Sequence, residues 1–186
     1  MEEKNLGNYR ILKHLAKGGM GEVFLAFDPV CSRTVALKKI REDFKKNPLM
    51  RRRFLKEAQI ASRLTHPAVI PIYSIHDDEN EIYYTMPYVE GKSLKELLIE
   101  ASQDPAKHSI PHFIRIFLSV CEAVAFAHLK KILHRDLKPA NILVGKYGEV
   151  LVLDWGIATF TDQKPATEEL KKKAENDPGL SEPEQK

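Results

Sequence analysis

Residues 134–141 read HRDLKPAN and residues 154–156 read DWG, and no other part of the chain is as informative. Together they supply the side chains of Asp136, Asn141 and Asp154. Carboxylate and amide oxygens bind Mg²⁺, and a carboxylate accepts a proton, as phosphoryl transfer requires. A chance loop rich in Asp and Asn would not account for all of the spacings, so the two motifs indicate a site for this chemistry.

Upstream of these motifs, the first 90 residues carry short β-branched and aromatic runs separated by turn residues, a pattern typical of antiparallel strands. The runs are 11–15, 23–26, 35–37, 69–75 and 82–84, and 142–144 and 150–153 predict two more strands beyond HRDLKPAN. One helix, over 50–64, is expected in the upstream part, because its apolar residues recur with helical spacing.

The carboxylate of Glu57 falls on the inward, apolar stripe of that helix. An unpaired buried carboxylate costs several kcal/mol, so Glu57 needs a cation. Lys38 ends the apolar strand 35–37, and such a lysine often just emerges into solvent. Pairing Lys38 with Glu57 satisfies the carboxylate and fixes an ammonium where it can hold phosphates.

A glycine-rich turn, AKGGMGEV at 16–23, lies between the first two expected strands. Glycines let backbone N–H groups approach phosphate oxygens closely. Taken alone, the pattern fits a flexible hairpin turn equally well.

The pattern becomes helical after residue 90. Ser93 with Glu96 forms a capping box that opens a helix over 94–101. A second helix, over 111–129, is apolar almost all round and therefore needs burial on more than one side. The polar stretch 161–186 is expected to be a disordered tail.

Composition excludes several classes of protein. The 186 residues are 43% hydrophobic and 30% charged, with a net charge of +3 and two cysteines in no metal-binding spacing. These values, a start without an apolar signal region and no uninterrupted apolar run of about 20 residues predict a cytoplasmic protein with no membrane segment. Nine Lys or Arg residues gather in 38–56, but a solvated helix face explains them better than nucleic acid binding does.

The ordered set of motifs resembles the eukaryotic-type serine/threonine protein kinases of bacteria, over residues 9 to about 160. The resemblance implies an α+β, protein-kinase-like fold. Residues 1–90 would form the antiparallel-sheet N-lobe with one helix and the hinge, and residues 91–160 the first, mostly helical part of the C-lobe. Residues 161–186 would follow as a polar tail.

The resemblance also implies ATP and Mg²⁺ as ligands, a protein Ser or Thr hydroxyl as acceptor, and a role for each site residue. Asp136 would accept the hydroxyl proton, Lys138 would neutralise the γ-phosphate, and Lys38, paired with Glu57, would hold the α- and β-phosphates. Magnesium would be held by Asn141 and Asp154. The nucleotide would be bound by Ala16, Lys17, Gly18, Gly19, Gly21, Val23, Ala36, Lys38, Met86, Pro87, Val89 and Leu143.

Three departures from the family pattern stand out: Ala16 replaces the first glycine of the loop, Trp155 replaces a phenylalanine, and the chain stops before an APE motif. We therefore expect the missing C-lobe helices, or a protein partner, to cover the helix at 111–129. The competing hypothesis is a non-catalytic module that binds a nucleotide or a partner, and phosphate incorporation into a substrate separates the two.

Overall fold

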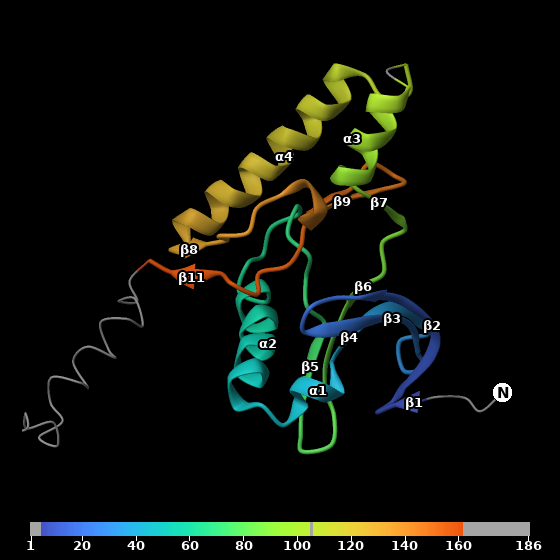
Figure 1. Cartoon of the computed structure of the whole chain (residues 1–186), viewed down its shortest axis with the longest axis vertical. Coiled ribbons are helices and arrows are strands. Elements are labelled where there is room, and N and C mark those ends of the chain that lie inside the picture. Colours follow the sequence, from blue (N-terminus) through green and yellow to red (C-terminus); the bar gives the residue numbers. More distant parts are fainter. Residues whose placement is uncertain (1–4, 105, 162–186) are drawn as a thin grey trace, which may run out of the picture.

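The structure, a computed structural model, describes residues 5–104 and 106–161. Its largest sheet has six antiparallel strands in the order β1-β2-β3-β4-β6-β5. The strands are β1 (Asn5–Leu6), β2 (Tyr9–Lys17), β3 (Gly21–Asp28), β4 (Arg33–Ile40), β5 (Ser74–Asp77) and β6 (Ile82–Pro87). In Figure 1 this curled sheet and the helix α2 make up the lower part of the molecule.

Helix α2 (Pro48–Ala61) begins two residues earlier than predicted and ends three residues earlier. The side chain of Asn47 caps it by accepting hydrogen bonds from the amides of Leu49 and Met50. The face turned to the sheet buries Phe54, Glu57 and Ala58, whereas Ile60 and Ala61 are buried in a second core with Val69 and Val152. A one-turn helix, α1 (Glu42–Lys45), precedes it, so this half holds two helices where the sequence predicted one.

Strand register sorts the side chains onto two faces of the sheet. Lys38 lies directly opposite Val23 on one side and opposite Tyr84 on the other, and Ala36 lies opposite Met86. Because side chains alternate along a strand, these five share the face that packs toward α2, while Lys39 and Tyr83 point to the outer face.

The other half contains α3 (Leu94–Gln103), α4 (Ile110–Leu129), a 3₁₀ turn η1 (Pro139–Asn141) and two small sheets. One sheet pairs β10 (Val150–Val152), β9 (Ile142–Gly145) and β7 (Gly91–Ser93), and the other pairs β11 (Thr159–Phe160) with β8 (Ile132–Leu133). The predicted capping box is present: Ser93 Oγ accepts from the Glu96 amide, and the Glu96 carboxylate accepts from the Ser93 amide.

The predicted strand over 69–75 is wrong in its first half. Only β5, from Ser74, is a regular strand, since Pro71 has no N–H to donate to a sheet. Val69 instead makes an isolated bridge to Val152, and the Val152 amide donates to the carbonyl of Ala68 at 2.8 Å. This segment joins the six-stranded half to β10 in the other half.

Helix α4 lies along the edge of the upper part of the molecule (Figure 1) and buries only one side. Ile116, Val120, Ala123 and Ala127 face the core, whereas Phe117 is 65% exposed. Ile110, Ile114, Leu118 and Leu129 are exposed as well. The prediction that this helix needs burial on more than one side is therefore unmet within the described residues.

One helix bears on the expectation of no membrane segment. α4 is long and apolar enough to cross a membrane by length and composition, although Arg115 and Glu122 interrupt its apolar run. A core helix of a soluble protein passes the same test, so this is weak evidence. The predicted tail from 162 to 186 lies outside the described residues.

Candidate active site

A buried ion pair lies on the α2 side of the sheet. Lys38 Nζ donates to Glu57 Oε1 at 2.6 Å, so the predicted pairing is present. Tyr84 donates its hydroxyl to the same oxygen at 2.7 Å. Glu57 Oε2 is buried and accepts no hydrogen bond from the described residues. One carboxylate oxygen thus receives both donors, and the ammonium stays at the inner face of the sheet.

The loop after β8 gathers three polar side chains around Asp136. Lys138 Nζ lies 2.7 Å from Asp136 Oδ2, and Asn141 Nδ2 donates both to that oxygen at 3.1 Å and to the Asp136 carbonyl at 2.9 Å. The hydrogen bond from Lys138, followed by that from Asn141, holds the pKa of Asp136 below its usual range. Asp136 is therefore a carboxylate at neutral pH, ready to accept a proton.

The ring of His134 ties this loop to the segment that carries Asp154. Its Nε2 lies 3.0 Å from the carbonyl of Leu153, and its Nδ1 lies 3.2 Å from the Asp136 amide. Since an amide only donates and a carbonyl only accepts, the ring is neutral with its proton on Nε2. Burial is the main cause that lowers the pKa of His134, which favours this neutral form.

Asp154 is held in a left-handed backbone conformation, with φ of 60°. One residue earlier, the Leu153 amide donates to the Asn141 carbonyl at 2.8 Å. One residue later, the ring of Trp155 packs against His134 with centroids 4.5 Å apart. These contacts bring Asp154 to the Asn141 loop, and the larger Trp155 ring is accommodated fully buried.

The glycine loop closes the hairpin between β2 and β3. A Cβ at Gly21 would lie 3.0 Å from the Lys39 carbonyl and 3.2 Å from Lys38 Cε, so glycine allows the loop to pack against Lys38. A Cβ at Gly19 would meet nothing within 4 Å. Packing within the protein therefore does not require glycine at position 19, whose carbonyl accepts a hydrogen bond from Arg41 Nη1 at 3.3 Å.

The predicted nucleotide residues fall into two groups. Val23, Ala36, Lys38 and Met86 share the inner face of the sheet, as the register requires. The remaining residues lie in the loop, the connection after β6 or the second half: Ala16 pairs opposite Val23, Gly18 bonds Gly21 within the loop, Pro87 ends β6, Val89 follows it, and half-buried Leu143 lies on β9.

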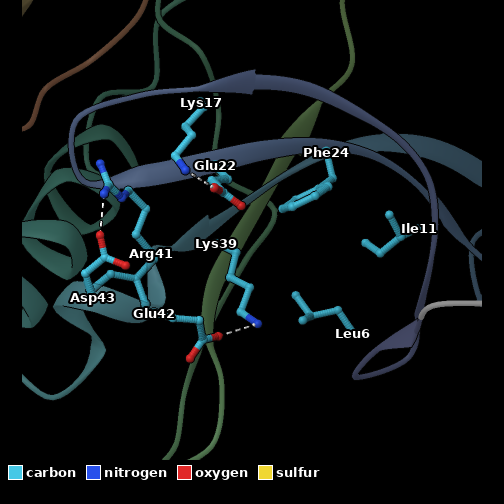
Figure 2. Close-up of a pocket in the computed structure, with 10 residues that line it drawn as sticks. Leu6, Ile11, Lys17, Glu22, Phe24, Lys39, Arg41, Glu42 and Asp43 are labelled. Atoms are coloured by element: carbon cyan, nitrogen blue, oxygen red, sulfur yellow. Dashed lines mark hydrogen bonds and ion pairs between the residues drawn. The ribbon is translucent and has the colours of Figure 1, made fainter.

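The side chain of Lys17 points to the outer face of the sheet. It pairs with Glu22 at the rim of a hollow of about 280 Å³ whose floor includes Leu6, Ile11 and Phe24 (Figure 2). This hollow is on the opposite side of the sheet from Lys38. Any contact of Lys17 with a phosphate would therefore have to come from its backbone.

Several cations of the basic stretch 38–56 pair with neighbouring acids. Lys39 and Lys45 both pair with Glu42, as Figure 2 shows for Lys39, and Arg51 pairs with Asp77. Arg41 likewise pairs with Asp43. Cations that are already paired offer less to a phosphate backbone than free cations do.

Comparison with known proteins gives the arrangement its family. The protein kinase domain family matches residues 9–176. The chain belongs to this family. Kinases of the family generally use ATP and Mg²⁺, and the predicted α+β kinase-like fold is confirmed.

The stretches YYTMPYVEG, HRDLKPAN and LDWG predict a particular likeness to the chlamydial kinase PknD, and this is confirmed. The chain is 53% identical over 170 residues to the serine/threonine-protein kinase PknD of Protochlamydia amoebophila, covering 87% of this chain and 17% of that protein. It is 48% identical over 180 residues to PknD of Chlamydia trachomatis, covering 93% and 19%. The chain thus spans less than a fifth of these relatives' length.

Solved kinase structures share this fold as well. A crystal structure of the Mycobacterium tuberculosis PknI kinase domain matches with a TM-score of 0.68 and 28% identity, covering 84% of this chain and 61% of that one. The structure titled PpkA-294 apo form matches with a TM-score of 0.72 at 23% identity, covering 83% and 60%, and shows the shared fold alone.

Sequence reasoning missed two residues that shape this kinase site. Tyr84 reads as one more aromatic in a strand, and only the pairing of β4 with β6 sets it opposite Lys38. His134 belongs to the quoted motif, but its two hydrogen bonds depend on how residues 134 and 153 come together in space. Neither arrangement leaves a signal in local sequence patterns.

Proposed function

We propose that the chain is the ATP-binding and catalytic-loop part of a serine/threonine protein kinase, which transfers the γ-phosphoryl group of ATP to a protein hydroxyl. The observation that carries the proposal is the pairing of Lys38 with Glu57 on the sheet, together with the Asp136, Lys138 and Asn141 cluster in the other half. We propose lobes of residues 1–90 and 91–160, in a cytoplasmic protein.

The residues present fit magnesium. Asn141 uses its nitrogen to bond Asp136, which leaves its side-chain oxygen for a cation. Asp154 is exposed and has one oxygen engaged, by the Gly156 amide at 3.3 Å. Mg²⁺ usually takes one or two protein carboxylates together with substrate phosphates, so a pair such as Asn141 and Asp154 is sufficient. When bound, the ion neutralises charge on the phosphates.

Each remaining side chain then has a task at a stated atom. Lys38 Nζ, fixed by Glu57 Oε1, would hold the α- and β-phosphates, and Gly18, Gly19 and Gly21 would cover them with their backbone. Val23, Ala36, Met86 and Leu143 would enclose the adenine, with hydrogen bonds at the Pro87 carbonyl and the Val89 backbone.

At the acceptor side, an Asp136 carboxylate oxygen would take the proton of the Ser or Thr hydroxyl as its oxygen attacks. Lys138, whose pKa is raised mainly by its hydrogen bond to Asp136, stays charged and can stabilise the transferring group.

The test is phosphate transfer from labelled ATP to a generic protein substrate, with Asp136→Asn as the variant. We expect the substitution to spare Mg-ATP binding, measured calorimetrically, and to lower transfer at least a hundredfold, as loss of a general base does. Lys107→Ala is the control, because Lys107 forms its ion pair with Glu100, and neither residue has a proposed role in the site. Unchanged transfer by the Asp136 variant would remove Asp136 as the base.

A second candidate is favoured by the exposed apolar side of α4, which includes Ile114 and Phe117. An exposed apolar patch of this kind marks an interface. In this second candidate function, the chain would bind nucleotide or a partner without transferring phosphate. Mg-ATP binding with no transfer, in wild type and in the Asp136 variant alike, supports this candidate over the first.

A further inference from the structure

Tyr84 lies at the centre of the Lys38 and Glu57 pair. It is 2% exposed and stands directly opposite Lys38 in the register of β4 and β6. Its hydroxyl donates to Glu57 Oε1 at 2.7 Å, and Lys38 Nζ donates to the same atom at 2.6 Å. The phenol therefore contacts the carboxylate that positions the ammonium, although it does not contact a site for phosphates itself.

Among the described residues, Glu57 has only these two donors, since its Oε2 accepts none. A buried carboxylate with one oxygen that accepts no hydrogen bond depends strongly on the hydrogen bonds to its other oxygen. Lys38 and Tyr84 together therefore fix the orientation of the Glu57 carboxylate. Burial, reinforced by the negative charge of Glu57, raises the pKa of Tyr84 well above its usual value, so the hydroxyl keeps its proton and always donates.

We propose that Tyr84 is a positioning residue, which fixes the Glu57 carboxylate and thereby holds the Lys38 ammonium at one place on the sheet with or without nucleotide. The proposal rests on the proposed function for its consequence in catalysis. Its structural core, the dependence of the Lys38 and Glu57 pair on one hydroxyl, can be measured separately.

The variant Tyr84→Phe isolates the hydroxyl. The ring packs against Phe54 with centroids 5.2 Å apart, and Lys38 Nζ lies 5.7 Å from its centre. Phenylalanine keeps these contacts and removes only the donor. Tyr83→Phe is the matched control, because Tyr83 is the adjacent residue, is also buried, and stacks on His76 at the outer face.

The direct readout is the rate at which acetic anhydride labels Lys38, followed by mass spectrometry of the folded chain below its unfolding temperature. We expect Tyr84→Phe to raise this rate about tenfold, the factor that loss of one hydrogen bond to a charged group corresponds to, and Tyr83→Phe to leave it unchanged. Looser packing would raise the labelling rate of neighbouring lysines such as Lys39 as well, whereas a positioning role raises the rate of Lys38 alone.

A third variant, Glu57→Gln, shows whether Tyr84 acts through Glu57. If it does, Tyr84→Phe in the Glu57→Gln background labels Lys38 no faster than Glu57→Gln alone. Additive effects, or an unchanged rate in Tyr84→Phe, would overturn the proposal. The double-variant cycle also keeps the test decisive if Tyr84→Phe is less stable, since every rate is compared at a temperature where all variants are folded.

The catalytic consequence is measured in parallel as the KM for ATP. We expect Tyr84→Phe to raise this KM about tenfold without changing the KM for the protein substrate. If Lys38 labels faster in Tyr84→Phe while the wild-type chain transfers no phosphate, that result supports the role of Tyr84 and counts against the proposed function. If the wild-type chain is active and Tyr84→Phe has the same KM for ATP as the wild type, the role of Tyr84 in catalysis is overturned.

Discussion

Replacing Lys38 by methionine tests the site through stability as well as through binding. Glu57 is 4% exposed, and the substitution removes one of its two hydrogen-bond donors and its only described cation. Removing one partner of a buried ion pair costs about 3–5 kcal/mol. Tyr84 still donates to Glu57 Oε1 and the methionine chain fills most of the lysine volume, so the lower end applies, about 3 kcal/mol.

That loss should be visible as a shift in melting temperature. For a chain of 150–250 residues, 1 kcal/mol corresponds to about 2–4 °C, so Lys38→Met should lower Tm by about 6–12 °C in a calorimetric scan. The double variant Lys38→Met with Glu57→Gln removes the stranded charge. It should recover at least half of the loss, because a neutral buried amide is less costly than an unpaired carboxylate.

The same calorimetric scans, repeated with Mg-ATP, measure nucleotide binding by the wild type and by Lys38→Met. Mg-ATP at about a hundred times its Kd should stabilise the wild-type chain by about 2.7 kcal/mol, and this gain should largely disappear in Lys38→Met. The reasoning is wrong if Lys38→Met has the same Tm as the wild type, or if the double variant is less stable than Lys38→Met alone. A full Mg-ATP shift in Lys38→Met would show that Lys38 does not hold the phosphates.

Three further predictions concern stability alone. Ile116→Ala, at a buried position of α4, should cost about 2–5 kcal/mol in urea unfolding, whereas Phe117→Ala, 65% exposed, should change stability by less than about 0.5 kcal/mol. Ser93→Ala removes the capping box of α3 and should cost about 1 kcal/mol, with Ser102→Ala as the control. Burial lowers the folded-state pKa of His134 below the ordinary histidine value of 6.5, so as the pH falls the unfolded chain binds the proton before the folded chain does. Stability present above pH 6.5 should therefore be lost as the pH falls below it, and urea midpoints at pH 7.5 and 5.5 should differ less in His134→Asn than in the wild type.

Local patterns were sufficient where one element decides the outcome. Helical spacing alone placed Glu57 on the buried face of α2, and the need for a cation then identified Lys38. The Ser93 capping box followed from four consecutive positions. In each case the physical constraint acts within one helix or between two elements of obvious pattern, so the sequence carries the information.

Contacts between residues far apart in the chain could not be predicted from the sequence. Strand β6 lies between β4 and β5, so Tyr84 reaches Lys38 across a pairing that chain order does not suggest. Val69 bridges to Val152 in the other half because Pro71 cannot continue a strand. Which cations of the basic stretch are neutralised also depended on loops that bring Asp77 to Arg51.

The two halves of the site are fixed by different parts of the chain, and they meet at Gly156. The Asp136 cluster is tied to the Asp154 segment through His134 and the bond from the Leu153 amide to the Asn141 carbonyl. A Cβ at Gly156 would lie 3.1 Å from Asp154 Oδ1 and 3.5 Å from Glu57 Oε2. Gly156 thus lies next to both Asp154, the proposed metal ligand, and Glu57, the partner of Lys38. A Cβ at this position would press on the Asp154 carboxylate and make ordinary contact with that of Glu57, so glycine leaves both carboxylates where the backbone places them.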